Sequence, residues 1–149
     1  MRDDGVGVHA VKAVQERFHV PPELDIVDGG TAGLDLLPFI EGRDRVLFVD
    51  AVDFGKEPGF VGELMNDDIP AFFGKDKGSL HHLGLADVLA TARLLNILPE
   101  EICLIGIQPQ SIEMGLELTE VLQGKFDLLV ALIIDKLRDW DVYLVPQSQ

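Results

Sequence analysis

Carboxylates stand at three points of this sequence where a strand gives way to a turn or a helix. Asp3 and Asp4 lead into a Gly-x-Gly and a helical pattern. Asp28 closes a short apolar segment, and Asp50 directly follows the run Val-Leu-Phe-Val. The carboxyl ends of parallel strands lie along one edge of a sheet, which is the usual ligand crevice of an open α/β fold. These carboxylates are therefore predicted to share a site.

Two adjacent histidines, His81 and His82, fall in the first turn of a helix expected after a long loop. Carboxylate oxygens and imidazole nitrogens gathered from separate strand and helix ends suit a borderline divalent metal ion. Nickel, zinc and cobalt all fit this set of donors. The residue types and their positions therefore indicate a metal site.

Each of these positions also has a purely structural interpretation. The first pair of carboxylates can offset the dipole of the helix that follows. Asp28 can shape the turn at the Gly-Gly pair after it, and the two histidines can be exposed residues of a helix start. Asp50 is harder to explain in this way, because a carboxylate beside four apolar residues is costly unless it is paired or ligated. Function is favoured at that position.

The apolar periodicity of the chain predicts helices that alternate with strands. Helices are expected at residues 6–18, 34–40, 79–95 and 126–140, strands at 24–27, 45–50, 60–65 and 102–107, and loops at 66–78 and 108–118. This order predicts an α/β fold with one twisted, mainly parallel sheet flanked by helices on both faces. The strand at 45–50 is expected to be buried on both faces. The strand at 60–65 is a candidate antiparallel edge strand.

Length and composition limit the class of protein. The 149 residues suffice for one domain with a real core, residues 1–149. A net charge of −14 argues against nucleic acid or an anionic membrane as a partner. No apolar run reaches the roughly 18 residues of a membrane span, and no signal peptide opens the chain, so a cytoplasmic protein is expected. Cys103 lies in an apolar run, which indicates a core residue rather than a nucleophile.

Five segments in register resemble the hydrogenase maturation endopeptidases, the proteases that process the large subunit of nickel–iron hydrogenases. They span nearly the whole chain: Asp3-Asp4-Gly5-Val6-Gly7, Asp28-Gly29-Gly30-Thr31-Ala32-Gly33, Val49-Asp50-Ala51, His81-His82-Leu83-Gly84-Leu85-Ala86-Asp87-Val88-Leu89 and Gly106-Ile107-Gln108-Pro109. No single motif is decisive, but five in the family's order are specific.

The resemblance implies an endopeptidase that removes the C-terminal extension of a hydrogenase large-subunit precursor after nickel has been inserted. It also implies a twisted sheet with a metal-binding cleft at its carboxyl edge. The resemblance further implies that the nickel used for recognition is the substrate's own and that zinc or cadmium can occupy the same ligands. The family is often classed with aspartic-type endopeptidases, although the motifs show no pepsin-like pair of carboxylates.

Carried over position by position, the resemblance assigns Asp4, Asp50 and His81 as metal ligands. His82 stands where other members carry Gln, and it is given no metal.

The Asp-Gly-Gly-Thr segment is assigned to the substrate. Asp28 is the candidate general base, acting on a water beside the scissile carbonyl. Gly29, Gly30 and Thr31 are expected to line the cleft and contact the substrate's tail. The segment lacks the Lys-Ser/Thr pair of a P-loop, so no nucleotide site is expected there.

The sequence departs from the family at its start. Members normally begin with an apolar strand, a Gly-x-Gly-Asn turn and a Leu-Met segment before the paired acids, and Met1 stands about where that internal Met would be. We therefore expect that the first strand is missing from the chain as written. Its absence would remove ladder hydrogen bonds and apolar cover. The chain as written is therefore expected to be poorly soluble or inactive, and an extended chain is not.

Two other functions stay open on the sequence alone. A nickel chaperone or sensor for the same pathway would bind nickel and a partner protein without cutting it. A small-molecule hydrolase with this kind of sheet would need no protein partner. The long loop expected at residues 66–78 favours a protein substrate, because a peptide tail needs an open cleft.

Overall fold

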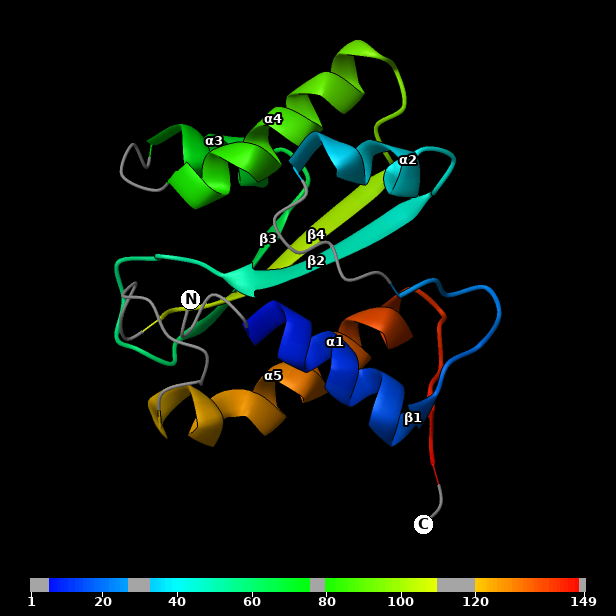
Figure 1. The fold of residues 1–149 in the computed structure, drawn as a ribbon, viewed down its shortest axis with the longest axis vertical. Helices are drawn as coiled ribbons and strands as arrows, with labels where there is room; N and C mark the ends of the chain where they lie inside the picture. The colour runs from blue at the N-terminus through cyan, green and yellow to red at the C-terminus, as the bar shows by residue number, and fades with distance from the viewer. Residues whose placement is uncertain (1–5, 27–32, 76–79, 110–119, 148–149) are drawn as a thin grey trace. The chain divides into compact units, whose positions relative to one another are not determined.

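The computed structural model describes residues 6–26, 33–75, 80–109 and 120–147 (Figure 1). Helices and strands alternate along these residues, so the predicted α/β class is confirmed. The chain forms two compact units. The first comprises Met1–Asp28, Val49–Gly62 and Ile105–Gln149, and the second comprises Gly29–Phe48 and Glu63–Leu104. A single domain over residues 1–149 stays a prediction.

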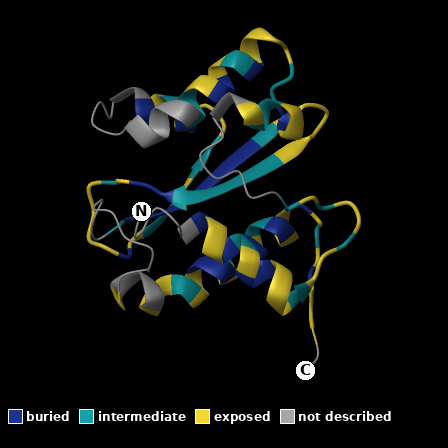
Figure 2. Cartoon of the chain, viewed as in Figure 1, coloured by how far each residue is buried: buried dark blue, intermediate teal, exposed yellow. Residues whose placement is uncertain are grey.

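The described residues contain a three-stranded sheet in the order β2 (Arg45–Ala51), β4 (Glu101–Ile107) and β3 (Val61–Met65). Its central strand, β4, is buried from its second residue to its last. Figure 2 shows this strand as one of the most continuously buried segments of the chain. A run of six apolar or small residues suits this place, because a central strand has neighbours on both edges.

Strand β2 runs parallel to β4. The amide of Glu101 donates to the carbonyl of Asp44 at one end of the pair, and the amide of Val52 donates to the carbonyl of Ile107 at the other. Residue numbers therefore rise together along the two strands, as the alternation of strands and helices predicted.

Strand β3 runs antiparallel to β4 at the edge of the three-stranded sheet. The amide of Gln108 donates to the carbonyl of Phe60 at one end, and the amide of Asn66 donates to the carbonyl of Ile102 at the other. Residue numbers therefore rise along β3 as they fall along β4, which is the antiparallel arrangement. The prediction of an antiparallel edge strand at residues 60–65 is confirmed.

In the first unit, α1 (Val6–Arg17) lies beside α5 (Glu120–Asp139) (Figure 1). The buried residues of each helix recur at helical spacing, as predicted from the apolar pattern. They are Ala10, Ala13 and Val14 on α1, and Leu129, Val130, Ile133, Ile134 and Leu137 on α5. Trp140 follows directly after α5 and is 8% exposed.

The segments that follow α1 and α5 meet in a short ribbon. Strand β1 (Phe18–His19) pairs antiparallel with β5 (Val145–Pro146). The side-chain amide of Gln147 also donates to the carbonyls of Gln15 and Phe18, at 3.1 and 2.9 Å. These bonds satisfy carbonyls at the end of α1 that have no partner within the helix.

The second unit contains η1 (Gly33–Leu36), α2 (Leu37–Ile40), α3 (Asp68–Lys75) and α4 (Leu80–Leu94). Pro38 lies in the first turn of α2, where a missing amide costs no hydrogen bond, so the predicted helix at 34–40 forms in spite of it. The core cluster of the second unit consists of the buried residues Ile40, Val88 and Ala92. Partly buried apolar residues pack against them: Leu36, Leu37, Val46, Phe48, Ile97 and Leu98.

Three sequence-based expectations are wrong. Residues 66–78 were expected to form a loop, but α3 occupies Asp68–Lys75. Ile69 and Phe73, four positions apart, bury one face of this helix, at 0% and 4% exposure. Pro70 is tolerated because it falls in the first turn.

The strand expected at residues 24–27 does not form over residues 24–26. Its side chains still alternate between half-buried and exposed, but none of the described strands pairs with it. The apolar run of β2 is half-buried instead of buried on both faces. Among the described residues β2 has one neighbouring strand, β4, so one of its edges lacks the cover of a central strand.

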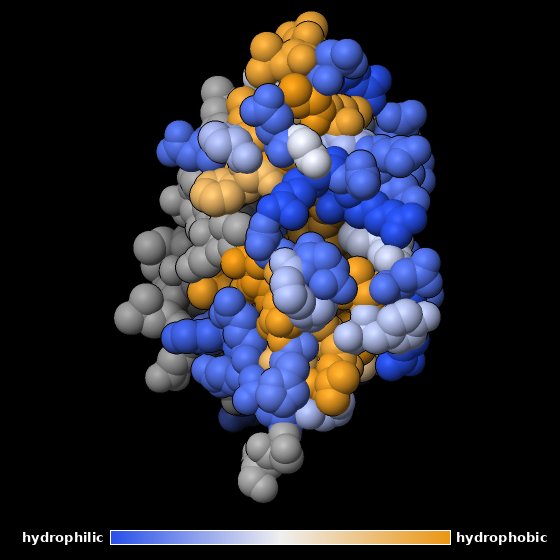
Figure 3. Space-filling model, turned by 90° about the vertical axis from the view of Figure 1, so that its right-hand side faces the viewer, coloured by the Kyte–Doolittle hydropathy of each residue, from blue (hydrophilic) through white to orange (hydrophobic). Residues whose placement is uncertain are grey.

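Hydrophobic residues appear as separate patches between hydrophilic ones on the face drawn in Figure 3. Leu94, at the end of α4, is 87% exposed, the largest value among the large apolar side chains that the structure describes. No helix within the described residues is long and apolar enough to cross a bilayer.

Candidate active site

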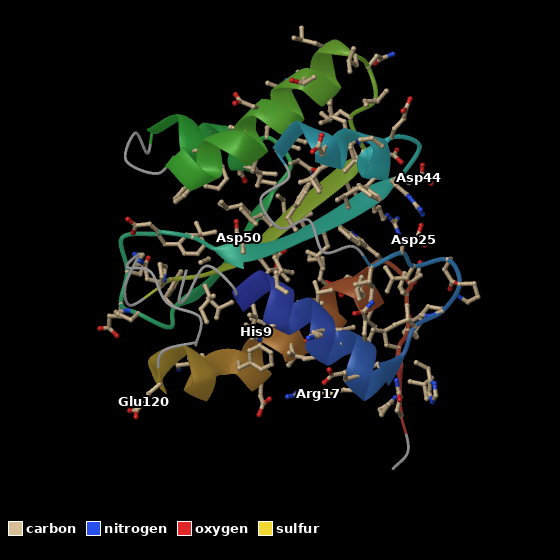
Figure 4. All side chains as sticks on the ribbon, viewed as in Figure 1. His9, Arg17, Asp25, Asp44, Asp50 and Glu120 are labelled. Carbon is tan, nitrogen blue, oxygen red and sulfur yellow. The ribbon has the colours of Figure 1, made fainter. Side chains whose placement is uncertain are left out.

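Asp50 occupies the next-to-last position of β2, at the carboxyl end of that strand. Figure 4 shows Asp50 and Asp44 near opposite ends of β2. The carboxylate is half-buried, and its Oδ1 accepts the amide hydrogen of Ala51 at 2.8 Å. Because this bond joins the side chain to its own strand, it restricts the directions in which the carboxylate can point.

The start of α1 lies against the same strand end. A Cβ added at Gly7 would stand 3.2 Å from the carbonyl carbon of Val49, 3.7 Å from the Cα of Asp50, and closer still to the Val49 oxygen. Only glycine permits this approach without a shift of the backbone. The second glycine of the Asp3-Asp4-Gly5-Val6-Gly7 segment therefore brings the first turn of α1 to Asp50.

A buried glutamine follows β4 and holds the segment that comes after Asp50. The Oε1 atom of Gln108 accepts the amides of Phe54 and Lys56, at 2.6 and 3.3 Å. Its Nε2 donates to Oδ1 of Asp53 at 3.1 Å, and the same oxygen accepts the amide of Gly55 at 2.9 Å.

Sequence reasoning quoted Gln108 only as part of a motif and gave it no role. The one available signal was a polar residue placed directly after six consecutive apolar or small ones, where burial is expected and a partner is needed.

His81 lies in the first turn of α4, so its predicted place on a helix start is confirmed. The side chains of His81 and His82 lie outside the described part of the structure. Asp4 and Asp28 also lie outside the described residues, as do Gly29, Gly30 and Thr31. The assignments of these residues as metal ligands, general base and substrate contacts stay predictions.

Within the described residues, no three His, Cys, Asp or Glu side chains gather in a way that could hold a metal ion. Of the three predicted ligands, only Asp50 has a described side chain. Cys103 is 0% exposed, which confirms its expected place in the core.

Comparison with known proteins identifies the family. The sequence model of the HycI family, described as hydrogenase maturation protease, matches residues 8–136. The hydrogenase expression/formation protein HupD of Rhodobacter capsulatus is 41% identical over 141 residues, which are 94% of this chain and 67% of HupD. The hydrogenase 2 maturation protease of Escherichia coli is 34% identical over 149 residues, with 99% and 90% of the two chains covered.

Solved structures agree with the sequence relatives. The hydrogenase maturating endopeptidase HybD from Escherichia coli superposes with a TM-score of 0.93 at 34% identity, covering 99% of this chain and 91% of HybD. The [NiFe] hydrogenase maturation protease HybD from Thermococcus kodakarensis has a TM-score of 0.70 at 26% identity, covering 92% and 90%. The match in fold and the match in sequence both extend over nearly all of this chain. The protein therefore belongs to the hydrogenase maturation protease family of endopeptidases.

Proposed function

We propose that this endopeptidase acts in the cytoplasm on the large-subunit precursor of a nickel–iron hydrogenase, and that it removes the precursor's C-terminal extension after nickel insertion. The observation that carries the proposal is the place of Asp50. It is a half-buried carboxylate at the carboxyl end of a strand, beside the start of α1, in a chain related to hydrogenase maturation proteases. Strand ends of this kind are the usual ligand site of an α/β sheet.

The proposed metal ligands are Asp4, Asp50 and His81. Two carboxylates and one imidazole suit nickel, which arrives as part of the substrate, and they also suit zinc or cadmium. The close packing at Gly7 supports the pairing of Asp4 with Asp50, because the helix that follows Asp4 in the sequence lies against the strand end that carries Asp50. A cation held by these residues would supply positive charge that can polarise a carbonyl and lower the pKa of a nearby water.

The remaining steps are assigned to protein side chains. Asp50 keeps its orientation through the amide of Ala51, so it can bind without first losing rotational freedom. Asp28 takes the proton of the attacking water as general base. Gly29, Gly30 and Thr31 contact the tail, where small residues allow a peptide backbone to come close.

The direct test is the intact mass of a hydrogenase large-subunit precursor before and after incubation with the protein. We expect nickel-loaded precursor to lose its C-terminal extension and nickel-free precursor to keep it. The protein's fold should be verified by circular dichroism in the same samples. Cleavage of both forms would disprove the dependence on nickel, and cleavage of neither by a folded protein would disprove the proposed substrate.

A further inference from the structure

The segment after Asp50, residues 53–60, is fixed along its length by Gln108; we call it the 53–60 loop. Besides the three side-chain bonds, the backbone of Gln108 forms two more. Its amide donates to the carbonyl of Phe60 at 2.7 Å, and its carbonyl accepts the amide of Gly59 at 2.9 Å. One residue at the end of the central strand therefore holds the loop at its start, middle and end.

The chemistry of these contacts requires glutamine. Gln108 is 7% exposed and is the one buried polar residue among those the structure describes. Its amide oxygen meets two backbone donors, and its amide nitrogen meets a carboxylate. An aliphatic residue would leave these groups without a partner, and a glutamate would set a second negative charge against Asp53. The side chain is thus matched to the loop at both of its polar atoms.

The loop borders a hollow of about 410 Å³, which is lined by Lys56, Glu57, Pro58, Gly59 and Phe60 of the loop and by Lys125 of α5. Lys56 lines this hollow, its backbone amide donates to Gln108, and its ammonium stands 6.0 Å from the centre of the Phe60 ring. Phe60 is 41% exposed. The hollow therefore combines two ammonium groups, one carboxylate and an aromatic ring.

The charged residues that line the hollow differ in sign from the chain as a whole, which is acidic. The chain carries 26 acidic and 12 basic residues, so its average surface repels a carboxylate. The residues that line the hollow include two lysines and one glutamate, a local excess of positive charge, while the loop's other carboxylate, Asp53, accepts hydrogen bonds from Gln108 and Gly55. An acidic side chain next to an apolar one matches these groups, because the ammonium groups bind the carboxylate and the Phe60 ring covers the apolar side chain.

We propose that the 53–60 loop is a substrate-docking surface that binds a peptide segment carrying a carboxylate beside an apolar side chain, and that Gln108 is the positioning residue that keeps this surface formed. The proposal rests on the proposed function, since it takes the peptide to be part of the precursor protein. Gln108 acts through the loop and does not touch the substrate. A change to the docking surface or to Gln108 should weaken substrate binding more than it slows cleavage of bound substrate.

The test measures the dissociation constant of the precursor and, separately, the cleavage rate at saturating precursor. Lys56→Ala removes an exposed ammonium without disturbing the backbone bond to Gln108, and we expect a rise of about three- to fivefold in the dissociation constant. The cleavage rate at saturation should stay within about twofold. Lys12→Ala is the control, because Lys12 is an exposed lysine of α1 outside the loop and should leave both values unchanged.

The role of Gln108 is tested by rescue. Gln108→Glu should raise the dissociation constant at least as much as Lys56→Ala, and adding Asp53→Asn should restore binding, because the new amide donor faces the new carboxylate. Unchanged binding in both Lys56→Ala and Gln108→Glu would overturn the proposal. The proposal would also be overturned if Lys56→Ala had no effect and the binding lost in Gln108→Glu were not restored by adding Asp53→Asn. If the wild-type protein binds but does not cut the precursor, the proposed function fails while the docking surface is still measured.

Discussion

The side chain of Gln108 and the carboxylate of Asp53 meet at 3.1 Å, although 55 positions separate them in the sequence. Their contact joins the end of the central strand to the loop that follows Asp50. The same glutamine accepts two backbone amides of that loop. The strand end that carries the candidate ligand therefore continues into a loop fixed by hydrogen bonds, which favours a binding surface formed before the substrate arrives.

Replacing Asp50 with Asn is expected to reduce precursor cleavage by about 100-fold or more, because a neutral amide cannot replace a carboxylate as a metal ligand. The change keeps an oxygen that can accept the amide of Ala51, so the thermal midpoint should move by no more than about 2 °C. Initial rates from intact-mass spectra measure the effect. Asp44→Asn, an exposed carboxylate before the other end of β2, is the matched control. Wild-type rates in the Asp50 variant would show that the ligand assignment is wrong.

His81→Ala is expected to abolish processing, whereas His82→Ala should retain most of it. The two histidines are adjacent on α4, so the pair compares a proposed ligand with a neighbour of the same type on the same helical turn. Isothermal titration of each variant with nickel-loaded and with nickel-free precursor measures nickel-dependent binding, a readout that does not depend on cleavage. Equal losses in both variants would point to helix stability and not to ligation.

Gly7→Ala is expected to destabilise the protein by about 1–3 kcal/mol, because the new methyl group meets the carbonyl of Val49. Gly124→Ala is the opposite case. It lies within α5, and an added Cβ there meets nothing within 4 Å, so a gain of about 0.4–1 kcal/mol is expected from reduced freedom of the unfolded chain. Urea unfolding of the three proteins measures both effects. Unchanged or increased stability in Gly7→Ala would contradict the packing at Gly7, and a loss of stability in Gly124→Ala would contradict the open space at that position.

Asn66 stabilises the junction of β3 and β4 in two ways. It adopts a positive φ of 48°, and its Oδ1 accepts the amide of Ile102 at 2.8 Å. Asn66→Gly loses only the side-chain bond, whereas Asn66→Ala loses the bond and also strains the backbone. We expect the alanine variant to be less stable than the glycine variant by about 1 kcal/mol, and both to be less stable than the wild type. The reverse order in urea unfolding would exclude the strain.

The sequence predicted those elements whose signal is local. The run of buried residues in β4 and the spacing of apolar residues on α5 are written in neighbouring positions, and both elements form as expected. Helix α3 was missed because, among its described side chains, only Ile69 and Phe73 are buried, within a stretch that also contains Pro70 and several charges. A short helix stabilised by tertiary packing has a weak local signature.

The candidate site was predictable to a different extent. Asp50 was found because a carboxylate after four apolar residues is a local anomaly. The role of Gln108 could not be found in this way, since most of its partners are backbone amides and carbonyls more than 45 positions away, and every residue type has these groups. Which backbone groups meet the Gln108 side chain depends on the register of the folded strands and not on the side chains of those partner residues.

The placement of Trp140 offers a practical means to separate folding from function in all of these variants. It is the only tryptophan of the chain, it is 8% exposed, and it follows the helix that packs against α1. Its fluorescence emission should therefore shift to longer wavelength when this unit unfolds and water reaches the indole. A variant that stops cutting while its emission maximum is unchanged has lost chemistry or binding and has kept the fold around the indole.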